Sequence, residues 1–131
     1  MPVSKKIRKA YEQLKPFNYS PIPFAEFYKR TFVPLSKTQN GDWYEGQWSE
    51  ITGKRDGFGY CIYEDGSLYE GYWQDGVQQG HGRIILHNGY YEGEFHGNQR
   101  HGEGSYYFNT GDFYQGEWVN SQKNGFGKMY N

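Results

Sequence analysis

The chain has 131 residues, of which 21% are aromatic and 19 are glycine, and its mean hydropathy is −1.02. This composition argues against a helical bundle and a thick aliphatic core, and the many aromatics argue against disorder. Residues 1–39 carry eight basic and two acidic side chains and residues 40–131 carry six and thirteen, which indicates a basic arm (residues 1–40) on an acidic body (residues 41–131).

The first predicted element is a short helix that begins after Ser4, a good N-cap residue, and runs to Leu14. Ile7, Tyr11 and Leu14 recur at i, i+4 and i+7, so they lie on one side of this helix. A helix of this length is marginal in water by itself. The basic side chains that crowd its first turns are Lys5, Lys6, Arg8 and Lys9.

The rest of the arm is rich in proline and aromatic residues. Four prolines up to Pro34 favour extended chain, and residues 24–33 are expected to contain a second short helical turn. Two interpretations stay open: the arm covers the first strand or the aromatic face of its own sheet, or it docks onto a partner protein. The side chains expected to make these contacts are Ile7, Tyr11, Leu14, Phe17, Tyr19, Phe24, Phe27, Tyr28 and Phe32.

Residues 41–131 contain one unit that is repeated about four times, starting at residues 44, 69, 91 and 114, with the last copy truncated. The hexamers WYEGQW, LYEGYW, YYEGEF and FYQGEW are each followed by a G-x-G phrase, and Asp-Gly or Asn-Gly turns separate most units. Such turns are strong hairpin signals. We therefore predict an all-β fold, an elongated and twisted antiparallel single-layer meander of stacked hairpins.

Side-chain alternation along a strand explains the hexamer. Tyr69, Gly71 and Trp73 fall on one face, and the glycine leaves a slot in which a ring from a neighbouring strand can lie flat on the backbone. The residues with this predicted structural role are Tyr44, Gly46, Trp48, Gly57, Gly59, Tyr69, Gly71, Trp73, Gly80, Gly82, Tyr91, Gly93, Phe95, Gly102, Gly104, Tyr114, Gly116, Trp118, Gly125 and Gly127.

The unit Y-E-G-x-W-x-x-G-x-x-x-G-x-G resembles the MORN repeat (membrane occupation and recognition nexus). YEGYWQDGVQQGHG at Tyr69–Gly82 is a near-complete match, and YEGEFHGNQRHGEG at Tyr91–Gly104 has Phe95 as its aromatic. The first unit carries a two-residue insertion, and the last has Gln115 in place of the acid. The resemblance implies a sheet of stacked hairpins without enzymatic activity, similar to the small MORN scaffold subunits of cilia and the cytoskeleton.

Other chemically active residues form no convincing site in the sequence. The four histidines lack the spacing of metal ligands, and Glu45, Glu70 and Glu92 repeat in register as a solvated acidic face would. Cys61 is expected to be a packed thiol. We expect no catalytic residue, metal or cofactor, and no nucleic-acid partner, because the body is acidic.

The sequence leaves three functions open. We expect a non-enzymatic scaffold that joins other protein subunits in a radial-spoke-like complex of the ciliary axoneme or in another cytoskeletal complex. It could also self-associate through the C-terminal edge strand Phe126–Tyr130. The single cysteine fits an intracellular location. The first alternative is a peripheral membrane adaptor that binds anionic phospholipids through Lys5, Lys6, Arg8 and Lys9. The second is an accessory subunit of an organellar complex.

Overall fold

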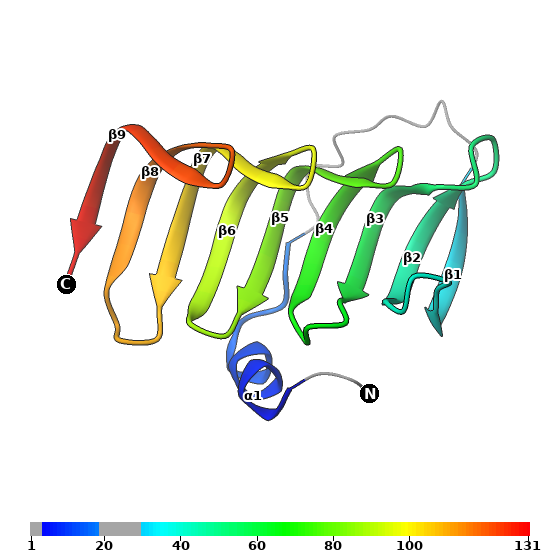
Figure 1. The fold of residues 1–131 in the computed structure, drawn as a ribbon, viewed down its shortest axis with the longest axis horizontal. Helices are drawn as coiled ribbons and strands as arrows, with labels where there is room; N and C mark the ends of the chain where they lie inside the picture. Colours follow the sequence, from blue (N-terminus) through cyan, green and yellow to red (C-terminus); the bar gives the residue numbers. More distant parts are fainter. Residues whose placement is uncertain (1–3, 19–29) are drawn as a thin grey trace.

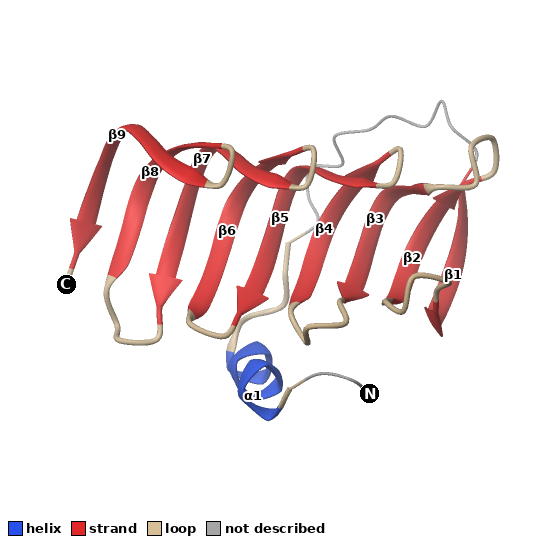
Figure 2. Cartoon of the chain, viewed as in Figure 1, coloured by secondary structure: helices blue, strands red, loops and turns tan. Residues whose placement is uncertain are grey.

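The computed structural model of the chain describes residues 4–18 and 30–131. In this part of the chain, nine strands form one antiparallel sheet in sequence order, and a short helix lies near one end of the strands (Figure 1). Figure 2 shows a single layer of strands with turns at both ends, which confirms the predicted all-β meander. The elements are α1 (Lys5–Gln13), β1 (Arg30–Lys37), β2 (Trp43–Ser49), β3 (Arg55–Ile62), β4 (Leu68–Gln74), β5 (Val77–Leu86), β6 (Gly89–His96), β7 (Gln99–Phe108), β8 (Phe113–Val119) and β9 (Gln122–Tyr130).

Each repeat hairpin contains the same β-bulge. In the β4–β5 hairpin, Gly71 pairs with Gly82, but Trp73 pairs with Gln78, so the register shifts between these two pairs. The bulged strand holds the first glycine of the G-x-G phrase, and Gly80 has a φ of 86°, which side-chain-bearing residues rarely adopt. The β2–β3, β6–β7 and β8–β9 hairpins shift at the same point. This glycine is therefore required by the backbone conformation.

The remaining glycines of the hexamers and G-x-G phrases form one continuous row across the sheet. Every member of the row pairs with the next one on the adjacent strand. Side chains would crowd this line, and their absence leaves room for rings to lie on the backbone. In order from β2 to β9, the row consists of Gly46, Gly59, Gly71, Gly82, Gly93, Gly104, Gly116 and Gly127.

The end of the arm is a strand of the sheet. β1 pairs with β2, with Val33 opposite Gly46, so the helical turn expected at residues 24–33 is wrong for residues 30–33. The register shifts between Val33 and Ser36, and this irregularity accommodates Pro34, which has no N–H to donate. β1 thereby covers the edge of the first repeat strand, as one of the two interpretations proposed.

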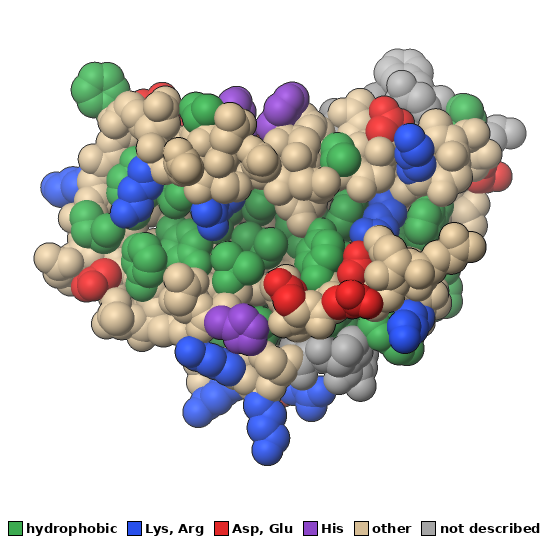
Figure 3. Space-filling model, viewed as in Figure 1, with side chains coloured by type: hydrophobic (Ala, Val, Ile, Leu, Met, Phe, Trp, Pro, Cys, Tyr) green, Lys and Arg blue, Asp and Glu red, His purple; other side chains and the backbone are tan. Residues whose placement is uncertain are grey.

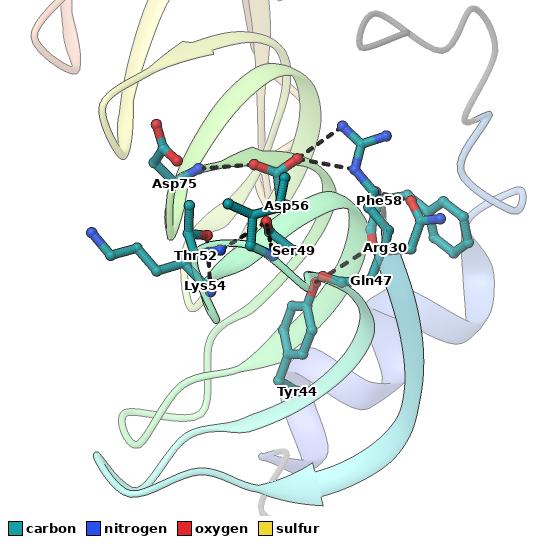
Figure 4. Close-up of polar contacts among 10 residues, drawn as sticks. Arg30, Tyr44, Gln47, Ser49, Thr52, Lys54, Asp56, Phe58 and Asp75 are labelled. Carbon is teal, nitrogen blue, oxygen red and sulfur yellow. Dashed lines mark hydrogen bonds and ion pairs between the residues drawn. The ribbon is translucent and has the colours of Figure 1, made fainter. Parts of the chain in front are cut away.

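An ion pair fastens β1 to the rest of the sheet (Figure 4). The Arg30 Nε and Nη2 atoms donate to Asp56 Oδ1 at 2.9 and 2.8 Å, across the intervening β2 strand. The second oxygen of Asp56 accepts from the backbone N–H of Asp75 at 3.3 Å, in the next hairpin turn. Both charged side chains are less than a tenth exposed, so the pair is shielded from solvent.

The predicted N-terminal helix is present as α1. The Ser4 hydroxyl accepts from the Ile7 N–H at 3.1 Å and caps the helix, which ends at Gln13 with Leu14 as its C-cap. Ile7 is fully buried against Leu68 and Ile85, with Tyr11 and Leu14 packed beside it. The helix thus uses its apolar side to dock on its own sheet.

Candidate interaction surface

The tyrosine of each repeat lies along its own strand. Its hydroxyl donates to the backbone carbonyl three residues further on, for example from Tyr69 to Tyr72 O at 2.8 Å. A Cβ atom at Gly82, on the next strand, would lie 2.5 Å from the Tyr69 hydroxyl. One ring therefore covers Gly71 of its own strand and Gly82 of its partner, whereas the sequence interpretation placed a ring from a neighbouring strand over the hexamer glycine. The equivalent donors are Tyr44, Tyr91 and Tyr114.

The repeat aromatics form one continuous row, which we call the aromatic ladder. Consecutive rings meet edge to face, with centroids 5.1 to 5.6 Å apart. Each such contact contributes about 0.5–1.5 kcal/mol beyond the area that it buries. In order along the sheet, the rings are Trp48, Tyr44, Trp73, Tyr69, Phe95, Tyr91, Trp118 and Tyr114.

Each repeat has one equivalent position next to the ladder, and in three of the four repeats its side chain is basic and lies over the rings. The Arg55 guanidinium lies 4.8 Å from the Tyr44 centroid and 5.0 Å from that of Trp73. In the same register, Arg100 and Lys123 stand over rings of the later repeats, and the second repeat has Gln78 instead. Sequence reasoning missed these residues, although each lies four positions before the second glycine of a G-x-G phrase.

The face that bears the ladder, here the ladder face, is hollowed in several places. Figure 3 shows hydrophobic side chains gathered along its middle, with Lys and Arg side chains among them. A hollow of about 740 Å³ lies beside Trp48 and Arg55, and one of about 370 Å³ lies beside Trp73 and Gln78. A third, of about 500 Å³, contains Arg100. The hollows follow the ladder from β1 to β9.

These hairpins match a known family. Residues 44–68, 69–89, 91–113 and 114–131 each match the MORN repeat, and each segment begins at the tyrosine whose ring covers a glycine pair. The chain belongs to the MORN-repeat family. MORN repeats are a non-enzymatic repeat family, and their presence suggests a protein-interaction or membrane-binding scaffold.

Residues 4–18 of the arm lie on the opposite face of the MORN array, here the arm face, and not over the aromatic ladder. Under the arm, Arg83 pairs with Glu70 at 2.5 Å, and both side chains are 5% exposed. The Arg83 Nη1 atom also donates to the Lys15 carbonyl at 3.0 Å, and the Tyr11 hydroxyl donates to Glu70 at 3.4 Å. The expectation of a solvated acidic row is therefore wrong for Glu70. Burial raises the pKa of this carboxyl group against the opposing effect of Arg83.

The basic residues of α1 lie on the part of the helix that is open to solvent. Lys5, Lys6, Arg8 and Lys9 are all exposed, whereas Ile7 on the same helix is buried against the sheet. The apolar side of α1 is therefore occupied, and only its cationic side is available to a ligand. Among the described residues, no helix is both long and apolar enough to cross a membrane.

The predicted partner-binding residues of the arm are divided by the fold. Phe17 is buried and stacks on the His81 ring at 4.9 Å, while Phe32 on β1 is 53% exposed. Ile7, Tyr11 and Leu14 pack on the sheet, as described above. Tyr19, Phe24, Phe27 and Tyr28 lie outside the described residues.

The histidines and the single cysteine are dispersed. Cys61 is fully buried, and burial raises the pKa of its thiol to about 12. His96 and His101 have ring centroids 5.4 Å apart, and His87 is exposed at a turn. In residues 4–18 and 30–131, no group of three or more His, Cys, Asp or Glu side chains is placed to hold a metal ion.

Proposed function

We propose that this MORN array is a non-enzymatic structural scaffold, a small subunit of a large assembly, located in the ciliary axoneme or in another cytoskeletal complex. The observation that carries the proposal is the hollowed ladder face, which residues 4–18 of the arm leave uncovered because they lie on the opposite face. Neighbouring subunits would bind there and along β9. That strand pairs only with β8 among the described residues, and its Phe126 is 88% exposed, which also supports pairing with a second copy.

A second candidate is a peripheral membrane adaptor. The exposed Lys5, Lys6, Arg8 and Lys9 would each contribute about 1 kcal/mol near an anionic lipid surface. Because Ile7 is buried against the sheet, this contact would be electrostatic and without apolar insertion. Physiological salt would then weaken it strongly.

Cell fractionation distinguishes the two candidates. The full-length protein would be expressed in ciliated cells, which are extracted first with non-ionic detergent and then with high salt. We expect the protein to stay in the pellet with tubulin through both steps, since an embedded subunit is held by many contacts. Release with a membrane marker in detergent alone would contradict the scaffold and favour the adaptor. A variant with Lys5, Lys6, Arg8 and Lys9 changed to Ala should behave as the parent if the scaffold proposal is correct.

A further inference from the structure

The hollow over β7–β9 holds two cations that lack an anionic partner. The Arg100 guanidinium lies 4.9 Å from the Trp118 ring centroid, and the Lys123 ammonium lies 4.8 Å from that of Tyr114. Within residues 4–18 and 30–131, neither side chain has a carboxylate within ion-pair distance. The rings attract the cations but do not neutralise them.

Arg100 is also incompletely hydrogen-bonded. Its Nη2 atom donates to the Ser121 carbonyl at 2.6 Å, but its buried Nε atom has no acceptor among the described residues. Burial lowers the pKa of this guanidinium. Removing a cation from water is unfavourable unless an anion and hydrogen-bond acceptors replace the water.

In the described sheet, the other arginines each have the carboxylate partner that Arg100 lacks. Arg30 pairs with Asp56, Arg55 lies 3.9 Å from Asp42, and Arg83 pairs with Glu70. The fold therefore supplies a carboxylate to each of these arginines from a nearby strand or turn. Among the arginines of the described strands, Arg100 is the exception, although it occupies the same register position as Arg55.

The walls of the hollow indicate the kind of anion that fits. The cavity of about 500 Å³ is lined by Leu86, Tyr106, Phe108 and Trp118 together with the two cations. Asn88 and Ser121, from turns at opposite ends of the strands, also line it, so the hollow runs along the strands between two turns. Arg100 is partly buried in it and Lys123 is exposed, so an acidic side chain of an extended chain segment can reach both cations.

We propose that this hollow anchors an acidic segment of a partner protein. An Asp or Glu carboxylate of the segment pairs with Arg100 and Lys123, and an adjacent aliphatic or aromatic side chain packs on Phe108 and Leu86. The anchor rests on the proposed scaffold function and defines the chemistry of one partner.

The test uses the full chain and a random peptide-display library, followed by fluorescence anisotropy with the selected peptides. The test variant is Arg100→Gln/Lys123→Gln, because Gln78 occupies the same register position in the second repeat and fits the fold there. The control variant, Arg8→Gln/Lys128→Gln, removes the same two charge types from exposed positions elsewhere. Thermal unfolding verifies that both variants are folded.

We expect selected peptides to carry Asp or Glu next to an apolar residue. Their affinity should fall about ten- to hundredfold in the test variant, as for the loss of a charge-assisted hydrogen bond, and remain unchanged in the control. Peptides without acidic residues, equal binding to the test variant, or no selected peptide would each overturn the anchor.

The same experiment also distinguishes a failure of the anchor proposal from a failure of the scaffold proposal. Neutral peptides that bind the parent and the test variant equally would leave the scaffold proposal intact and remove only the anchor. Phosphatidylserine vesicles serve as a second probe. If they bind through Arg100 and Lys123 while no acidic peptide does, the ligand is lipid and the peptide proposal is wrong.

Discussion

Each repeat tyrosine is held at several points. The Tyr69 ring lies over the Gly71–Gly82 pair, and its hydroxyl donates to Tyr72 O at 2.8 Å. Its ring also meets Trp73 and Phe95 edge to face, both at 5.1 Å. Tyrosine and glycine are therefore needed together, because a side chain at either glycine would displace the ring from its hydrogen bond.

Gly93→Ala tests this arrangement. A Cβ atom there would lie 2.5 Å from Gly104 Cα and 2.6 Å from Glu103 O, and these backbone atoms cannot move without breaking the β6–β7 ladder. We expect the free energy of unfolding to fall by about 3 kcal/mol, the upper part of the usual range for overpacking. Urea unfolding monitored by tryptophan fluorescence measures the loss.

The control for this variant is Gly97→Ala. Gly97 has nothing within 4 Å of its Cβ position, but its φ is 56°. That substitution should cost only about 1–2 kcal/mol, from backbone strain. Equal losses in the two variants would show that ring and backbone contacts at Gly93 are not the cause.

For single residues, the sequence predicts which face of the sheet a side chain lies on, but not which atoms it contacts. Alternation alone places Tyr69, Gly71 and Trp73 together, because it is a property of any strand. The hydrogen bond from Tyr69 to Tyr72 O depends on the side-chain rotamer, which no pattern of residue types reveals. The lack of an ion-pair partner for Arg100 among the described residues depends on every neighbouring strand.

Among the elements, α1 depends most on its surroundings. A nine-residue helix without acidic residues in its first turn is marginal in water. Burial of Ile7 between Leu68 and Ile85 supplies the stabilisation that its own sequence lacks. The helix should therefore unfold locally when this contact is lost, without unfolding the sheet.

Ile7→Ser should undock α1. Loss of the buried side chain is expected to cost about 2–5 kcal/mol, which exceeds what so short a helix can sustain. Hydrogen–deuterium exchange should show loss of protection in residues 4–14, with the amides of β6 and β7 unchanged. Lys9→Ser makes the same kind of change at an exposed position on α1 and should leave the protection intact. Persistent protection in Ile7→Ser would mean that other arm contacts suffice.

The two ends of the arm differ in how well they could be predicted. The limits of α1 follow from the Ser4 cap and from the spacing of Ile7, Tyr11 and Leu14, which are local signals. β1 was missed because Pro34 and the aromatic residues around it give no strand pattern, and its conformation comes from pairing with β2. The burial of Glu70 likewise depends on a segment more than 50 residues away, since Tyr11 reaches it from α1.

At the scale of the whole molecule, the stability of the sheet depends on buried phenols and one buried thiol. Burial raises the pKa values of Tyr44, Tyr63 and Tyr91 above that of an exposed phenol, and raises that of Cys61 to about 12. Their ionised forms are excluded from the folded state. The unfolded chain ionises first, and alkali should therefore destabilise the fold.

The sign of the pH dependence follows from the raised pKa values. Stability is fully present well below pH 9, where thiol and phenols are neutral in both states, and it is lost as pH rises from about 9, the ordinary pKa of a thiol, toward the folded pKa values. Each group contributes a slope of up to about 1.4 kcal/mol per pH unit. Urea midpoints across this range, with phenolate absorbance as a second signal, measure the loss. In Cys61→Ala the decrease should begin nearer pH 10, and a flat profile in the parent would contradict this account.

The strand order also determines how the molecule would respond to a pulling force. Each strand pairs only with its neighbours in the sequence, from β1 to β9, and no described strand crosses to a distant position. Consider a force that pulls β1 and β9 apart. It would separate the strand pairs one after another, because each pair can open without breaking the hydrogen bonds of the others. A sheet with this topology can lengthen in hairpin-sized steps under load and re-form step by step when the load is removed.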